Sequence, residues 1–358
     1  MTSTPEPSPD RTAIRFTGMG DYIAAIPALL GFYPERSIVL LGHDDATCQT
    51  GPTARFDLVL TPGGDLAPPC HTGIAEMVRL CKQQGAQRMF CVVVDDRPID
   101  AALPAITDRL VKSLAAEGDD DWDADLVDLF VIRRIAVDER WTCAHGDAGR
   151  LPDPEINEAT LARMLDGRPV QRSRSELVER LTEEGRGVTE ADCRAAERPR
   201  RGGGSLVAGR DATRLRLVVD AAVRGAPVPD DDVPRLGAAL LSLRVRDAAF
   251  ALAATEAADS ATEVFAELAR RLRGTPRAAA ATLVAGISYV RAVGPMVGIG
   301  LDAALAADPD YRAAHLLLQA FDGGMTPELL AGLVDVGQDI ARELGVVMPR
   351  VDPLAMAG

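Results

Sequence analysis

Residues 89–94 read Met-Phe-Cys-Val-Val-Val, an uninterrupted apolar run that is typical of a buried β-strand. An amphipathic helical pattern precedes this run over residues 73–84, and a second helix is predicted over residues 101–116. Another strand is predicted over residues 126–137. Strands that alternate with helices in this way pair in parallel through right-handed crossovers. We therefore predict an α/β domain with a mixed, partly parallel sheet.

Two more strands are predicted upstream, over residues 37–42 (SIVLLG) and 55–60 (RFDLVL). The polar residues that separate them show no helical period, so we pair the two strands as an antiparallel hairpin. Residues 140–143 are predicted to add a further hairpin strand. Together these segments place the α/β domain at residues 13–150, after a polar and Pro-rich tail over residues 1–12 that we expect to be disordered.

Beyond residue 150 the strand signals stop and helical periodicity replaces them. Residues 151–205 are predicted as a helical connector that ends in a Gly- and Arg-rich linker (RPRRGGGS), and residues 206–350 as a domain of helical hairpins. Its helices are predicted over residues 206–224, 231–254, 260–273, 277–292, 295–307, 311–322 and 327–344. Small Ala and large Leu residues at helical spacing before Asp308-Pro309 favour tetratricopeptide-like packing. The alternative is a generic antiparallel helical bundle.

The charge balance excludes several classes of function. The 358 residues include 39 Lys and Arg against 53 Asp and Glu, which gives a net charge of −14. This balance argues against general coating of nucleic acids and against a polybasic membrane anchor. No apolar stretch is long enough to span a membrane, and the polar N-terminus does not resemble a secretory signal. The six cysteines form no Cys-x-x-Cys motif, so we expect reduced thiols in a cytoplasmic protein.

Several short motifs follow one another along the chain. They are the stretch from Asp21 to Leu40, Arg55–Leu58, Arg140-Trp141, Ser173–Leu177, Arg244–Asp247 and residues 307–317. In this order, over about residues 20–325, they resemble the actinobacterial family known as domain of unknown function 4192. The positions that carry the resemblance best are Pro27, Leu30, Gly31, Phe32, Pro34, Ser37, Arg55, Asp57, Arg246 and Asp247. The resemblance implies one fold along the chain but does not specify an activity.

One loop departs from the family's pattern. Many members carry a Cys-Cys-Pro sequence after the tryptophan that corresponds to Trp141, whereas here Cys143 is followed by Ala144-His145-Gly146-Asp147. The pair Cys143 and His145 and the pair Cys70 and His71 both lack the ligand spacing of a structural zinc site. We therefore predict no metal site from the sequence.

A ligand site is predicted at the carboxyl ends of the parallel strands, where open α/β sheets bind their ligands. The predicted strand order brings Gly63, Gly64, Asp95, Asp96 and Asp138 to this edge. Carboxylates beside glycine-rich backbone are suited to Mg²⁺ and phosphate. The favoured alternative is that Asp95 and Asp96 cap a turn and the helix that follows it.

The remaining motifs are incomplete. Gly18-Met19-Gly20 lacks the third glycine of a dinucleotide fingerprint, because Ile23 occupies that position. The acidic stretch at residues 117–125 lacks the glycine and the terminal glutamate of a calcium loop. The sequence contains no complete motif of a hydrolase, kinase or metalloprotease. Arg246 and Asp247 are predicted to form a partly buried ion pair that orients helices.

These observations favour a cytoplasmic binding or scaffolding protein whose helical half holds a protein partner. The alternative is a nucleotide- or metal-dependent enzyme or regulator with its site at the strand ends, and the sequence specifies no cofactor. Specific DNA binding through residues 194–216 is the least favoured class because of the net charge.

Overall fold

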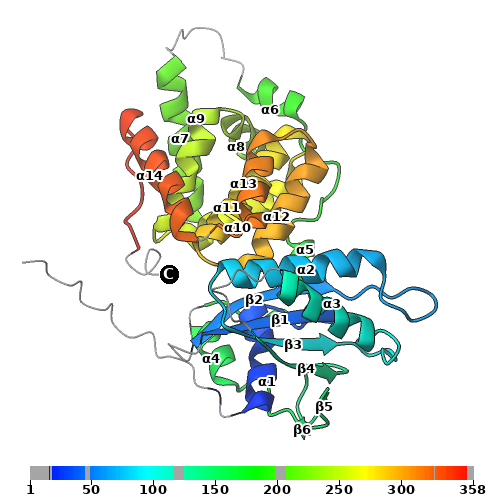
Figure 1. The fold of residues 1–358 in the computed structure, drawn as a ribbon. Helices are drawn as coiled ribbons and strands as arrows, with labels where there is room; N and C mark the ends of the chain where they lie inside the picture. The colour runs from blue at the N-terminus through cyan, green and yellow to red at the C-terminus, as the bar shows by residue number, and fades with distance from the viewer. Residues whose placement is uncertain are drawn as a thin grey trace, which may run out of the picture. The chain divides into compact units, whose positions relative to one another are not determined.

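The chain forms two compact units, Met1–Arg174 and Ser175–Gly358. A computed structural model (Figure 1) describes residues 16, 18–44, 49–116, 125–165, 167–197, 207–325 and 327–352. The first unit contains a mixed sheet with helices and the second is mostly helical, as the sequence predicts. The division falls within the predicted connector. The predicted tail at residues 1–12, the acidic stretch at 117–124 and the linker at 198–205 lie outside the described residues.

The first unit is built on a six-stranded sheet with the strand order β2-β1-β3-β4-β5-β6. The strands are β1 (Ser37–Asp44), β2 (Gln49–Asp57), β3 (Arg88–Val94), β4 (Asp125–Ile132), β5 (Arg140–Cys143) and β6 (Ala148–Arg150). β3 and β4 pair in parallel, and the other neighbouring strands pair antiparallel. The predicted β1–β2 hairpin and the predicted parallel β3–β4 pair are therefore confirmed.

The position of β1 differs from the simplest alternating pattern. β1 lies between β2 and β3, although the chain passes from β2 through a helix to β3. β2 and β3 still run in the same direction, because each is antiparallel to β1. The predicted strand over residues 126–137 is too long. It ends at Ile132, since Arg133 and Arg134 are exposed and begin the connection to β5.

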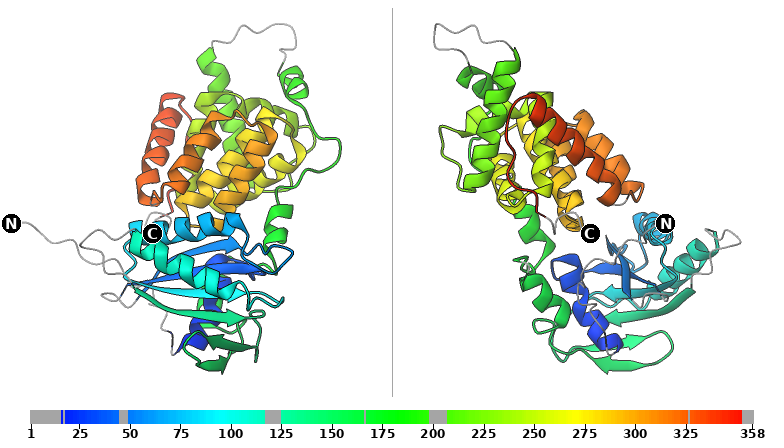
Figure 2. Two further views of the ribbon diagram at one scale, coloured as in Figure 1. Left: turned by 45° about the vertical axis from the view of Figure 1, so that its right-hand side comes forward. Right: turned by 90° about the vertical axis from the view of Figure 1, so that its left-hand side faces the viewer.

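Helices cover both faces of the sheet. α2 (Pro68–Gln83) and α3 (Leu103–Ala116) lie on one face and α1 (Met19–Leu30) lies on the other, as Figures 1 and 2 show. The apolar stripe predicted for α2 is buried against the sheet, with Ile74 and Met77 in one core with Met89 and Cys91 of β3. Each such side chain contributes roughly 1.5–3 kcal/mol when it is fully buried. The core therefore fixes the sheet that carries the strand ends.

The second unit is a succession of helices. They are α5 (Arg174–Glu179), α6 (Glu190–Ala196), α7 (Val207–Arg224), α8 (Val233–Leu240), α9 (Leu243–Ala249), the 3-10 helix η1 (Phe250–Ala254), α10 (Ala258–Arg271), α11 (Thr275–Val290), α12 (Gly294–Ala307), α13 (Arg312–Asp322) and α14 (Pro327–Glu343). The single helix predicted over residues 231–254 is wrong. It is divided because Ser242 adopts an extended conformation (φ −79°, ψ 120°) at the start of α9.

α11 forms the centre of this unit. Almost every side chain of α11 is buried, and the helix packs against α10, α12 and η1. Gly300 of α12 permits a close approach, because a Cβ atom there would lie 3.0 Å from the carbonyl oxygen of Ala281. The small residues of α11 and α12 thus allow the two helices to pack with little space between them.

Candidate functional site at the strand ends

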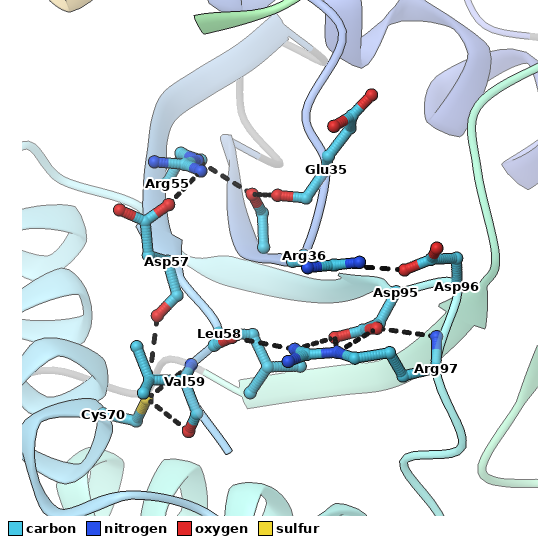
Figure 3. Close-up of polar contacts among 11 residues, drawn as sticks. Glu35, Arg36, Arg55, Asp57, Leu58, Val59, Cys70, Asp95, Asp96 and Arg97 are labelled. Carbon is cyan, nitrogen blue, oxygen red and sulfur yellow. Dashed lines mark hydrogen bonds and ion pairs between the residues drawn. The ribbon is translucent and has the colours of Figure 1, made fainter. Parts of the chain in front are cut away.

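The register of the sheet gathers polar residues at one edge. Ser37 begins β1 and lies opposite both Asp57, the last residue of β2, and Val94, the last residue of β3. Asp95 and Asp96 follow β3 directly. We call this region the strand-end edge and define it as Arg36, Ser37, Arg55, Asp57 and residues 95–97 (Figure 3). The predicted edge therefore exists, and it contains arginines that the sequence analysis did not include.

Asp95 closes the turn after β3. Its carboxylate is fully buried, and its Oδ1 atom accepts a hydrogen bond of 2.8 Å from the backbone N–H of Arg97. The Arg97 guanidinium donates to both carboxylate oxygens, from Nε to Oδ1 at 2.9 Å and from Nη2 to Oδ2 at 2.6 Å. It also donates to the carbonyl oxygen of Leu58, at 3.1 Å. Asp95 thus caps the turn, whereas the predicted cap of the following helix is absent because α3 begins only at Leu103. Arg97 stands between the Asp95 carboxylate and any cation.

Arg55 holds a partly desolvated positive charge beside Ser37. Its Nε donates to Ser37 Oγ at 2.9 Å, and that hydroxyl donates to the carbonyl oxygen of Glu35 at 2.7 Å. Its Nη2 donates to Asp57, and its guanidinium lies 5.8 Å from the centre of the Phe32 ring. Burial lowers the pKa of the Arg55 guanidinium, and the charge of Asp57 acts in the opposite direction. Arg55 is only 13% exposed, while its partner Asp57 is 63% exposed.

Arg36 and Asp96 form the solvent-facing pair of the edge. Arg36 Nε lies 3.2 Å from Asp96 Oδ1, and both side chains are more than half exposed. The hydrogen bond from Arg36 holds the pKa of the Asp96 carboxyl below its usual value of 3.8. Arg36 has a φ of 45°, a left-handed conformation that costs a non-glycine residue about 1–2 kcal/mol. The hydrogen bond from Leu58 N–H to the Arg36 carbonyl oxygen, at 2.7 Å, helps to hold it.

The other predicted ligand residues lie apart from this network. Asp138 is in the connection from β4 to β5 at the same edge, is exposed, and has a φ of 60°. Gly63 and Gly64 form the turn after β2, where the Gly64 N–H donates to the carbonyl oxygen of Thr61. Within the described part of the chain, none of these three residues has a hydrogen bond or ion pair to Asp95 or Asp96. The predicted five-residue site is therefore not assembled by direct contacts.

The family motif around Pro27 shapes the approach to the edge. Pro27, Leu30 and Gly31 end α1, and Gly31 adopts a φ of 82° that suits a glycine at a helix terminus. A Cβ atom at Gly31 would lie 2.6 Å from the Arg163 guanidinium, which would have to move aside. Phe32 is buried, and the turn that contains Pro34 then leads into Arg36 and Ser37. These motif residues therefore position the edge.

Arg246 and Asp247 belong to the second unit. Arg246 Nε donates to Asp247 Oδ1 at 2.8 Å, so the predicted ion pair is present within α9. Arg246 also donates to the Tyr311 hydroxyl at 3.3 Å, and its guanidinium lies 5.8 Å from the centre of that ring. The pair thus connects α9 to the start of α13.

A third donor joins Cys143 and His145, which the sequence analysis considered as an isolated pair. Asp128 Oδ2 lies 3.0 Å from Nδ1 of His145, and the potential ligand atoms of Asp128, Cys143 and His145 all lie within 4.8 Å of one another. Partial burial tends to raise the pKa of Asp128, but hydrogen bonds from Cys143 and His145 outweigh this and the pKa is lowered. The hydrogen bond to Asp128 raises the pKa of His145. The register of β4 and β5 brings these three side chains together, a proximity that their spacing in the sequence does not indicate.

The other described cysteines are in different surroundings. Cys70, Cys81, Cys91 and Cys193 are free and buried. Burial raises the pKa of Cys81 and of Cys91 to about 12, which suppresses the reactive thiolate. Cys143 is instead partly accessible.

The model of the family described as "Domain of unknown function (DUF4192)" matches residues 20–328. The chain belongs to the DUF4192 family. The match begins in α1 and ends in α14, so the DUF4192 region includes both the sheet and most of the helical unit. The resemblance based on the motifs is confirmed.

No curated protein and no solved structure matches this DUF4192 chain. Among the helices of the described residues, none combines the length and the apolar character needed to cross a membrane.

Proposed function

We propose that this DUF4192 protein binds a phosphorylated small molecule, such as a nucleotide, at the strand-end edge, in a regulatory and not a catalytic role. The observation that carries the proposal is the presence of two guanidinium groups beside Ser37. Arg36 directly precedes Ser37 in the sequence, and Arg55, opposite Val39 in the β1–β2 register, donates to the Ser37 hydroxyl. The planar guanidinium group donates two parallel hydrogen bonds to phosphate oxygens. The carboxyl ends of strands are also the usual ligand site of open α/β sheets.

The existing ion pairs favour exchange with an anion. The Arg36–Asp96 pair is exposed on both sides, so it contributes little stability and a phosphate group can replace Asp96 at small cost. Arg55 is desolvated, so an additional anionic oxygen near it interacts more strongly than it would at the surface. The left-handed backbone of Arg36 is a further argument, because such strain concentrates at functional sites.

The same ion pairs disfavour the magnesium-dependent mechanism considered from the sequence. Asp95 is occupied by a two-point contact with Arg97, and Asp96 by Arg36. A cation at either carboxylate would have to displace an arginine and then lie beside its positive charge. We therefore favour recognition of the ligand by arginine over catalysis by metal-bound carboxylates.

The test is a titration of the full chain with ATP, pyrophosphate and inorganic phosphate, with and without Mg²⁺, followed by calorimetry and by thermal unfolding. We expect at least one phosphate compound to bind and to raise the unfolding temperature. Arg36→Gln should weaken its binding about tenfold, the value of one charged hydrogen bond. The matched control is Arg79→Gln, which removes an arginine paired with Glu76 on α2. Binding of no phosphate compound, or equal loss in both variants, would refute the proposal.

A second candidate function is the binding of a protein partner by the helical unit. α14 buries Leu330 and Val334, yet it also exposes Leu333 and Val336, which are 38% and 53% exposed and lie at helical spacing. Successive helices from α10 to α13 pack on one another, which supports a tetratricopeptide-like arrangement over that part. We propose that an apolar helical segment of a partner packs on this second stripe of α14.

This candidate is tested by quantitative pulldown with a double variant. Leu333→Glu with Val336→Glu should abolish capture of a stoichiometric partner, because two charges would be buried in the interface. The control is Val223→Glu, which places the same charge at an exposed valine on a different helix, α7. Capture of the same partner by the double variant would contradict this assignment.

A further inference from the structure

The β4–β5 hairpin brings three different donor groups to one place. Cys143 ends β5 and lies opposite Phe130 of β4 in the ladder. Beyond this pair the chain turns, and the hydrogen bond from Ala144 N–H to the Leu129 carbonyl oxygen, at 3.0 Å, keeps the turn against β4. His145 therefore reaches back to Asp128, with its Nδ1 atom 3.0 Å from Asp128 Oδ2. The Cys143 sulfur lies within 4.8 Å of the donor atoms of both Asp128 and His145.

We infer that Asp128, Cys143 and His145 form a binding site for a divalent metal ion of the zinc class. Their donor atoms are a thiol sulfur, an imidazole nitrogen and a carboxylate oxygen, the three kinds of ligand that zinc takes from proteins. The combination of thiolate and imidazole selects against Mg²⁺ and Ca²⁺, which prefer oxygen ligands. The inference does not depend on the proposed phosphate site. It concerns the turn from β5 to β6, on the side of the sheet opposite to the strand-end edge, together with Asp128 inside β4.

The observed spacing fits a tetrahedral ion after a small contraction. With metal–ligand distances of about 2.0–2.3 Å, the ligand atoms of a tetrahedral zinc site lie about 3.3–3.7 Å apart. The three donor atoms lie within 4.8 Å of one another, and the Asp128 Oδ2–His145 Nδ1 pair, at 3.0 Å, is slightly shorter than this spacing. A shift of the order of 1 Å in side chains on a turn is sufficient to reach this geometry.

In the absence of an ion, the three side chains contact one another at the place where a cation would bind. His145 Nδ1 lies 3.0 Å from Asp128 Oδ2, and both His145 and Cys143 favour the charged form of the Asp128 carboxyl and so lower its pKa. Binding of the ion replaces these contacts. The thiol releases its proton to solvent and forms a metal–sulfur bond. His145 Nδ1 also gives up its proton, while Nε2 keeps or takes one from solvent, and the lone pair left on Nδ1 binds the metal. Asp128 also accepts the Leu129 N–H at 2.7 Å, which fixes its orientation.

Exposure shows how the ion enters. The His145 side chain is 73% exposed and can move, whereas Asp128 is 11% exposed and forms the base of the site. Three protein ligands leave one tetrahedral position for water, which is the arrangement of open zinc sites.

The experiment uses Co²⁺ as a spectroscopic probe on the full chain, after chelation and reduction. We expect one equivalent of Co²⁺ to produce a thiolate-to-cobalt charge-transfer band that Zn²⁺ removes. Cys143→Ser should abolish the band, and His145→Gln should weaken Co²⁺ binding by about tenfold or more, since loss of even an outer-shell partner costs at least that much. Alkylation followed by peptide mapping should show that Zn²⁺ protects Cys143.

Two control variants each remove a residue of the same type elsewhere. Cys193→Ala and His315→Gln, both in the second unit, should leave the band and the affinity unchanged. Circular dichroism should show that the Cys143 and His145 variants remain folded, because both residues lie at the end of a hairpin. The inference is overturned if Co²⁺ gives no thiolate band. It is also overturned if the band survives in Cys143→Ser or disappears in Cys193→Ala.

Discussion

The two edges of the N-terminal sheet place their carboxylates beside opposite kinds of partner. At the strand-end edge, Asp57, Asp95 and Asp96 each contact an arginine. At the opposite edge, Asp128 contacts a thiol and an imidazole. A guanidinium group keeps its proton at every accessible pH and is not a metal ligand. Thiol and imidazole groups lose their protons readily and do bind metals.

This difference decides which ligands each edge can take. The arginine-lined edge repels cations but can exchange a carboxylate for an anionic ligand group. The thiol- and imidazole-lined edge can exchange protons for a metal ion. An aspartate at the end of a strand therefore does not by itself indicate a magnesium site. Its function depends on the partner that the fold brings to it.

The largest effect is expected where the pair at the strand-end edge is most buried. Asp95→Asn replaces one carboxylate oxygen by an amide group that faces the Arg97 guanidinium as a second donor. The variant should lower the free energy of unfolding by about 2–3 kcal/mol, somewhat less than for a fully buried pair because Arg97 is 33% exposed. Urea denaturation monitored by circular dichroism measures this change.

Asp96→Asn is the matched control, because it removes the adjacent carboxylate from an exposed pair with Arg36. We expect little change in stability, since exposed ion pairs contribute little. Equal destabilisation by the two variants would show that burial does not distinguish the pairs, and the structural role assigned to Asp95 would then be wrong.

The sequence predicts this edge in part, and the missing part is informative. Asp95 and Asp96 were identified because they follow a strand that a local apolar run predicts reliably. Their partners Arg36 and Arg97 were missed, although Arg97 is adjacent to Asp96. A pattern of carboxylates and glycines indicates a ligand site but does not show which neighbouring cations neutralise the carboxylates. Asp128 was missed for a different reason, because its contact with His145 depends on the β4–β5 register.

The order of the strands in the sheet was also predictable only in part. The β1–β2 hairpin follows from two strands with a short connection, and the parallel β3–β4 pair from a strand–helix–strand pattern. The insertion of β1 between β2 and β3 is a non-local choice. The apolar strands β1 and β3 have side chains suited to burial on both faces, so their patterns are compatible with either order. The break in the helix at Ser242 was missed because the apolar period continues across it.

A second and smaller effect is expected at Arg55. Arg55→Lys keeps the charge, but one ammonium group cannot reproduce the separate hydrogen bonds to Ser37 and Asp57. We expect a loss of about 1–2 kcal/mol in the free energy of unfolding. The control Arg134→Lys changes an arginine that is 77% exposed and paired with Glu139, and it should be neutral. If Arg55→Lys is also neutral, the geometry of the guanidinium is not required there.

The smallest effect is expected at the opposite edge, where the pKa of His145 is raised. The hydrogen bond to Asp128 raises the pKa of His145 above its usual value of 6.5. The resulting stabilisation is present in full below pH 6.5 and is lost as the pH rises through the folded-state pKa of His145. Proton NMR of the four histidines should identify one ring with a raised pKa that falls toward 6.5 in Asp128→Asn.

This titration also tests the contrast between the edges. A guanidinium group keeps its proton throughout the pH range in which an imidazole titrates, so the imidazole is what distinguishes the opposite edge in this test. A pKa of 6.5 or below for His145 in the metal-free chain would mean that the imidazole does not face Asp128 in solution. The carboxylate would then lack, in solution, the imidazole partner that distinguishes it from Asp95 and Asp96.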